Sequence, residues 1–238
     1  MPDDGASGGQ GDSAGQARGE RSVFPGSRFF RRLFIYFLGN FVLAFGVALA
    51  AKSNLGLTPI NSIAYVVSRI LSVDHGLMTA VVYCGYVLVQ LVILRKEFRP
   101  LSFLQIGVAV LFGFFVSLCN RILSFLVPEA YWFRILLMLA SVIMIALGLF
   151  LYLRAELLPQ PGDGLLLTIQ KKTGWKLHNT KMFLDCTVTA SAAAVSLIAA
   201  RRIIGIREGT LIAMFGIGKV MGFFSGRLGP KIDAFFRL

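Results

Sequence analysis

Long charge-free apolar runs constrain this chain more than any other feature of its sequence. Residues Leu33–Ala51 contain no charged side chain over 19 positions, close to the ~20 residues that an α-helix needs to cross a bilayer. Similar runs follow, and 56% of the residues are hydrophobic, more than in an average soluble domain. The sequence therefore predicts an all-α, multi-pass membrane protein. The expected spans are Leu33–Ala51, Leu77–Leu94, Leu101–Asn120, Ile135–Leu153, Met182–Ala200 and Gly209–Ser225.

The first 27 residues differ from the rest of the chain in composition. They are rich in Gly, Ser, Asp and Gln and contain no apolar core, which is unlike a secretory signal peptide. Such a segment cannot bury enough surface to offset the entropy of ordering it. We expect residues 1–27 to form a disordered polar tail and residues 28–238 to form one membrane domain.

Two shorter apolar segments interrupt the series of spans. Ile60–Leu71 lies between spans one and two, and Gly164–Gln170 lies between spans four and five. The order long, short, long, long therefore occurs twice, which indicates an internal duplication. The best matches at an offset of 102 residues pair Gly46 with Gly148, Pro59 with Pro161, Asn61 with Asp163 and Cys84 with Cys186.

The expected repeats cover residues 28–129 and 130–238, and each contains three spans. Because three is an odd number, the second repeat would enter the membrane in the opposite orientation. With the N-terminus in the cytoplasm, 14 Lys and Arg residues flank the spans on the cytoplasmic side and 7 flank them outside, as the positive-inside rule favours. The outer set comprises Lys52, Arg69, Arg121, Arg134, Arg201, Arg202 and Arg207.

The sequences NLGLTPIN (54–61) and LLPQPGDG (157–164) break the helical pattern at corresponding positions of the two repeats. Matched breaks of this kind point to the binding site of a transporter, because they free backbone groups that only a ligand, an ion or water can satisfy. Ordinary loop formation and helix capping by Asp163 are the alternative. The candidate substrate-binding residues are Thr58, Pro59, Asn61, Ser62, Pro161, Asp163 and Gly164.

Three stretches carry a resemblance to a known family: NLGLTPINS (54–62), PGDGLL (161–166) and REGTLIAMFGIGKVMGFF (207–224). From about Arg28 onward, the chain resembles the YczE family of bacterial membrane proteins, which is related to the YitT group. The family's first motif usually has Pro-Trp-Asp where this chain has Pro59-Ile60-Asn61, so the resemblance carries no charge-based role to Asn61. It implies a membrane protein with a transport or accessory role.

Two charged residues fall within apolar runs. Asp185 lies in span five and Lys219 in span six, and their estimated depths are compatible with an intramembrane charge pair. Such a pair marks a functional site by default, although a purely structural tie or a Lys219 side chain that extends to the interface would also account for it. Gly218, Gly222 and Gly226 recur every four residues, which is typical of close helix packing.

Other classes of function have less support. The excess of basic residues flanks the spans, which favours contact with lipid headgroups over nucleic-acid binding. His75 and His178 occupy matched positions in inverted repeats, so they would lie on opposite faces and could not share a metal ion. The sequence contains no catalytic motif such as H-E-x-x-H. We therefore expect no enzyme activity, no cofactor and no metal.

The favoured function is a transporter or permease-like protein for a small solute in the bacterial cytoplasmic membrane, with the N-terminus in the cytoplasm. The alternative is a membrane scaffold or accessory protein that supports another complex without transport. The expected partners are the lipid bilayer, a small-molecule solute, and either a second copy of the chain or another membrane protein. Faces of small residues suit such helix partners.

The predicted topology can be tested by labelling. Single cysteines that replace Arg99 and Lys172 in a cysteine-free background should react only with a reagent applied from the cytoplasm, and one that replaces Arg202 should react only from outside. The reason is that inverted repeats place these loops on opposite sides. Labelling of positions 99 and 202 from the same side would contradict the inversion.

Overall fold

The computed structural model describes residues 27–97 and 100–237. Most of the expected N-terminal tail (1–26) and Arg99 lie outside these residues. Within the described ranges the secondary structure is entirely helical, with no strand. The α-helices are α1 (Ser27–Ser53), α2 (Pro59–Leu71), α3 (His75–Leu94), α4 (Leu104–Ile122), α5 (Tyr131–Arg154), α6 (Pro161–Thr173), α7 (Leu177–Ala200) and α8 (Glu208–Arg237); short 3-10 turns are η1 (Arg95–Glu97), η2 (Pro100–Phe103) and η3 (Leu123–Phe125).

Six of these helices are long and apolar enough to cross a membrane: α1, α3, α4, α5, α7 and α8. The prediction of six spans is therefore confirmed. The observed helices extend beyond most of the predicted ends, because polar residues that flank an apolar run can continue a helix into the interface. The two short segments form α2 and α6, each of 13 residues, which is too short to cross a bilayer alone.

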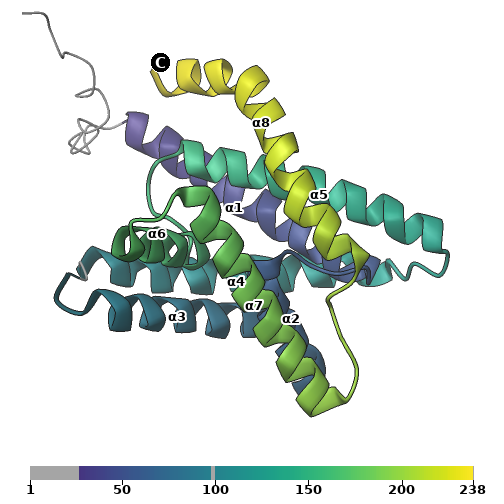
Figure 1. Ribbon diagram of the computed structural model, residues 1–238. Coiled ribbons are helices and arrows are strands. Elements are labelled where there is room, and N and C mark those ends of the chain that lie inside the picture. The colour runs from purple at the N-terminus through teal and green to yellow at the C-terminus, as the bar shows by residue number, and fades with distance from the viewer. Residues whose placement is uncertain (1–26, 98–99, 238) are drawn as a thin grey trace, which may run out of the picture.

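The contact between α1 and α5 is the most extensive helix pair (Figure 1). Glycines let the two backbones meet. A Cβ atom added to Gly46 of α1 would lie 2.7 Å from the amide nitrogen of Ile145, and one added to Gly148 of α5 would overlap the amide nitrogen of Leu43. Such close contact provides van der Waals attraction between the helices, which matters in lipid because no hydrophobic force drives helices together there.

The remaining helices pack unevenly around this pair. In the first half, α3 and α4 lie against each other, with Gly76 and Gly113 in backbone contact. In the second half, α8 packs along α5, whereas α7 and α8 hardly touch. A Cβ atom on Gly218, Gly222 or Gly226 of α8 would meet no other atom within 4 Å, so the expected close packing at these glycines does not occur with another helix of the described chain.

The break between α1 and α2 is held by the loop that joins α7 to α8 and by the first turn of α8. Gly56 has a φ of +123°, a conformation open to glycine but strained for other residues. The Leu57 amide donates to the Gly205 carbonyl oxygen (3.2 Å), and the Gly209 amide donates to that of Leu55 (2.9 Å). The break is therefore an ordered part of the fold, with backbone groups satisfied by a segment about 150 residues away in the sequence.

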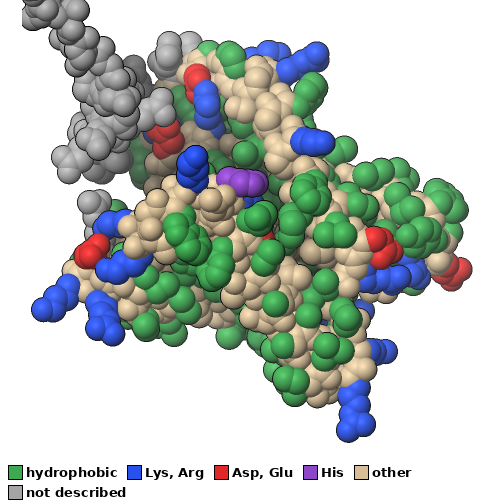
Figure 2. Space-filling view, in the orientation of Figure 1, with side chains coloured by type: hydrophobic (Ala, Val, Ile, Leu, Met, Phe, Trp, Pro, Cys, Tyr) green, Lys and Arg blue, Asp and Glu red, His purple; other side chains and the backbone are tan. Residues whose placement is uncertain are grey.

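The surface agrees with a membrane environment. On the face shown in Figure 2, hydrophobic side chains cover much of the middle of the molecule, and most Lys and Arg side chains lie toward its edges. Large apolar side chains on the outer faces are exposed, including Phe114, Ile198 and Phe215 at 61%, 83% and 69%. Exposed apolar area of this extent is expected where lipid is the solvent.

The glycine contact between α1 and α5 makes a stability prediction. Gly148→Ala should lower the free energy of unfolding by about 1–3 kcal/mol, because the added methyl group has to push two backbones apart. Gly218→Ala is the matched control, since a Cβ atom there enters open space, and alanine favours helix over glycine. Thermal unfolding in detergent measures both variants. Equal midpoints would contradict the contact.

Candidate functional site

Helices α2 and α6 begin beside one cavity of about 300 Å³. They come from different halves of the sequence, and a Cβ atom on Gly162 of α6 would lie 2.7 Å from the side chain of Ile60 of α2. The two breaks that were matched by sequence are thus neighbours in space. The polar side chains around the cavity are those of Thr58, Asn61, Tyr83, Gln160, Asp163, Lys181 and Asp185.

The local sequence explains where each short helix starts. Thr58 and Gln160 are the N-cap residues, with extended backbones, and each is followed by a proline at the first helical position. Proline is preorganised for that position and needs no hydrogen-bond acceptor. Neither N-cap side chain bonds to its own helix backbone. The next N–H groups, on Ile60 and Gly162, have no partner within their helices, and both residues line the cavity.

Asn61 is held in place by its neighbours. Its amide nitrogen donates to the Thr58 hydroxyl oxygen (2.8 Å), and the Tyr83 hydroxyl donates to its amide oxygen (3.0 Å). The Tyr83 ring in turn stacks on Phe112, with ring centroids 5.5 Å apart. The Asn61 side chain is therefore largely engaged within the protein, and only part of its hydrogen-bonding capacity faces the cavity.

Asp163 lies in the first turn of α6, where the helix dipole stabilises a negative charge. Its side chain is half-buried and forms no hydrogen bond or ion pair with another described residue. Lys181, Asp185 and Tyr83 line the same cavity, and both charged groups interact electrostatically with the Asp163 carboxylate. Its carboxylate oxygens are thus free to accept hydrogen bonds from a bound molecule.

The structure does not bring Asp185 and Lys219 together. Asp185 is buried and pairs with Lys181, four residues earlier on α7, at 3.1 Å, while Lys219 is exposed on α8. The two helices hardly touch, so similar depths do not produce a contact. The predicted pair is thereby replaced by one within α7, and Asp185 still lines the cavity.

Three predicted residues lie behind the cavity wall. The Ser62 hydroxyl donates to the Thr58 carbonyl oxygen (3.1 Å). The Pro161 carbonyl oxygen accepts from the Gln90 side chain (3.1 Å). Gly164 lets α6 approach the polar cluster of Gln90 and Gln105, because a Cβ atom there would lie 2.7 Å from the Gln105 amide oxygen. These residues fix the two helix starts, whereas Thr58, Pro59, Asn61 and Asp163 line the cavity itself.

Tyr83, Gln160 and Lys181 also line the cavity, and none of them was predicted from the sequence. A signal for each was present. Tyr83 lies 102 positions before Asp185, and Thr58 lies 102 positions before Gln160, so the offset that paired Asn61 with Asp163 also pairs these residues. Lys181 precedes Asp185 by one helical turn, the usual spacing of an ion pair on a helix.

The cavity is suited to reversible binding of a small molecule. It combines two carboxylates, one ammonium group, amide and hydroxyl groups, and an apolar wall that includes Leu43, Ile145 and Met214. A few fixed polar groups in an apolar surround are typical of ligand pockets. Among the described residues no group of three or more His, Cys, Asp or Glu side chains could hold a metal ion.

Six apolar spans and two short helices that begin at a shared cavity define a multi-pass α-helical membrane protein. Residues 30–226 match the model of a family of unknown function, DUF6198, and the chain belongs to that family. It is also 29% identical over 161 residues to the uncharacterized membrane protein YczE of Bacillus subtilis (strain 168), across 66% of this chain and 71% of that protein. The expected resemblance to the YczE family is confirmed. No solved structure matches the chain.

The ion pair on α7 can be tested by a double-mutant cycle. Asp185→Asn and Lys181→Met should be non-additive by about 0.5 kcal/mol, a modest coupling because Lys181 exposes 60% of its side chain to solvent or headgroups. Lys219→Met is the matched control and should be additive with Asp185→Asn. The measurement is the free energy of unfolding in detergent. Additivity in the first cycle would show that Lys181 and Asp185 do not interact.

Proposed function

We propose that this protein binds a small solute in the cavity between α2 and α6 and moves it across the membrane. One observation carries the proposal: two broken segments from corresponding places in the sequence begin helices at the same cavity. Helix starts at such breaks present unpaired N–H groups, and secondary transporters use them for binding at the interface between repeats.

The proposal includes two inverted repeats, and the helix contacts support them. Helices α1, α2, α3 and α4 of the first half correspond in order to α5, α6, α7 and α8 of the second. The contacting pairs α1–α4, α2–α3 and α2–α7 have the counterparts α5–α8, α6–α7 and α3–α6, and all six pairs are in contact. The contact of Gly46 with the Ile145 amide likewise corresponds to that of Gly148 with the Leu43 amide, since both residues shift by 102 positions. This two-fold relation is what an inverted duplication would produce.

One difference between the two halves supports a movement of the helices between two packing arrangements. Helices α3 and α4 pack closely, whereas their counterparts α7 and α8 hardly touch. If the halves share one ancestral structure, each half can adopt either packing. Exchange of the two packings would open the cavity on one side and then on the other, which is the alternating access that such folds use.

The lining favours a cationic or hydroxyl-bearing solute. Asp163 and Asp185 contribute two negative charges, and Lys181 offsets one of them. The apolar wall would accommodate a short hydrocarbon portion of the same molecule. The proposed setting is a bacterial cytoplasmic membrane with the N-terminus in the cytoplasm, as the Lys and Arg distribution favours.

A ligand screen tests the proposed function. Purified protein is heated with a panel of small organic cations, polyols and amino acids, because a ligand of the folded state raises the unfolding temperature. Asp163→Asn should keep the fold. It should weaken the apparent affinity for the active compound about tenfold, and so reduce the shift in unfolding temperature, because a charge-assisted hydrogen bond is lost. Glu129→Gln, which removes an exposed carboxylate elsewhere, is the control.

Unchanged binding by a stable Asp163→Asn protein would limit Asp163 to helix stabilisation. The scaffold alternative has its own signature: no compound shifts the unfolding temperature, and a protein partner co-purifies from the native membrane. Uptake by proteoliposomes of the compound that gives the largest shift then tests transport itself.

A further inference from the structure

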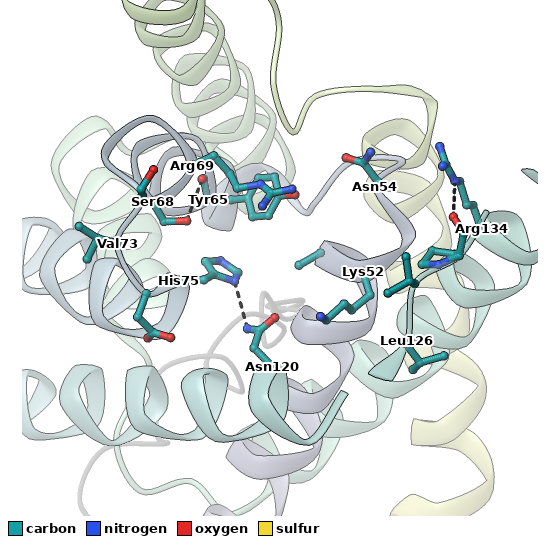
Figure 3. Close-up of a pocket in the computed structure, with 15 residues that line it drawn as sticks. Lys52, Asn54, Tyr65, Ser68, Arg69, Val73, His75, Asn120, Leu126 and Arg134 are labelled. Atoms are coloured by element: carbon teal, nitrogen blue, oxygen red, sulfur yellow. Dashed lines mark hydrogen bonds between the residues drawn. The ribbon is translucent and has the colours of Figure 1, made fainter. Parts of the chain in front are cut away.

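A second cavity, of about 560 Å³, lies where α1 and α2 end and α3 and α5 begin. None of its lining residues is among the substrate-binding residues predicted from the sequence. Figure 3 shows the Lys52 side chain reaching toward His75 and Asn120, with Arg69 on the other side of the space and Arg134 at its rim. The cavity shares no lining residue with the one between α2 and α6.

Three cationic side chains line this cavity from three different helices: Lys52 of α1, Arg69 of α2 and Arg134 of α5. None forms an ion pair with another described residue. Lys52 and Arg69 lie in the last turns of their helices, where a cation is favourable, but Arg134 lies at the start of α5, where it is not. Arg134 Nε donates to the Pro128 carbonyl oxygen (3.0 Å), and the Arg69 guanidinium lies over the Tyr65 ring (5.6 Å). These contacts position the two arginines but leave their positive charges without a counter-ion.

The cavity contains one acidic side chain, Asp74, and it is committed elsewhere. Asp74 caps α3, and its carboxylate accepts from the Leu77 amide (2.9 Å) and from the Ser117 hydroxyl. Burial raises the pKa of Asp74, but its hydrogen bonds together lower the pKa by more than burial raises it. The pKa of Asp74 therefore lies below its usual value. Three cations thus face one carboxylate that already has its donors, which leaves an excess of positive charge.

A buried donor without a partner accompanies the cations. His75 is 9% exposed. The Asn120 amide nitrogen donates to the Val116 carbonyl oxygen (2.9 Å) and lies 3.3 Å from His75 Nδ1, so Nδ1 accepts. In the neutral ring the hydrogen is then on Nε2, which has no hydrogen-bond partner in the described part of the chain. Buried donors are rarely left unpaired.

We propose that this cavity binds a phosphate group, held by Lys52 and Arg69, with Arg134 at the rim and the polar side chain of His75 in the wall. Phosphate oxygens point in several directions and can therefore meet cations from separate helices, which a planar carboxylate does less well. Leu126 and Val127 in the lining would contact an attached organic portion. The phosphate group would belong either to a free solute or to a lipid headgroup. The inference does not depend on transport through the other cavity.

Two probes distinguish the sources of the phosphate group. Inorganic phosphate is titrated against the detergent-purified protein at constant ionic strength, and dihexanoyl phosphatidylglycerol is titrated below its micellar concentration; calorimetry gives each Kd. Arg69→Gln and Lys52→Gln should each weaken binding about tenfold, and Arg69→Lys, which keeps the charge, should weaken it less. Arg121→Gln, an exposed arginine at the end of α4 outside the cavity, should bind as the unmodified protein does.

Saturable binding of inorganic phosphate with this order of variants would support a free phosphate-bearing solute. Binding of the phosphatidylglycerol alone, in the same order, would support a lipid headgroup. Failure of the unmodified protein to bind either probe would overturn the proposal. So would equal losses in Arg69→Gln and Arg121→Gln, since attraction to a basic surface would then suffice. Size-exclusion profiles of the variants establish that each is folded.

Discussion

Backbone contact between α1 and α5 is the interaction on which the other helices depend. Glycines at positions 46 and 148 allow the two most buried spans to approach until main-chain atoms touch. Van der Waals packing of this kind is one of the attractions that hold helices together in lipid. Helix α4 then packs on α1, and α8 packs on α5. The short helices α2 and α6 need no spanning length, because neighbouring spans surround the ends at which they begin.

The two cavities differ in the sign of the charged side chains that line them. Between α2 and α6, carboxylates predominate, and Lys181 reaches Asp185 along its own helix. At the end of α1, cations predominate, and the one carboxylate is tied up in a helix cap. In the predicted topology this basic end faces outward, against the general excess of Lys and Arg inside. A phosphate site would explain why these basic side chains occur on the outer side.

Much of the fold could be predicted from the sequence, because charge-free length and Gly/Pro breaks are local properties that a bilayer turns into strong constraints. Asn61 and Asp163, which were matched by their offset in the sequence, both line the same cavity. The partner of Asp185 could not be found from depth alone, because a contact also depends on how each helix is rotated and on whether α7 and α8 pack. The spacing of glycines on α8 likewise could not reveal whether a partner helix was present.

The hydrogen bonds between the α1–α2 break and the α7–α8 loop have a consequence for protein engineering. Surface loops usually accept inserted tags or reporter domains, since few contacts depend on their length. The loop around Gly205 is different, because its carbonyl oxygen and the Gly209 amide hold the segment from Leu55 to Leu57. Residues inserted there would displace the start of α2, so a fluorescent reporter in this loop would perturb the cavity that it was meant to leave intact.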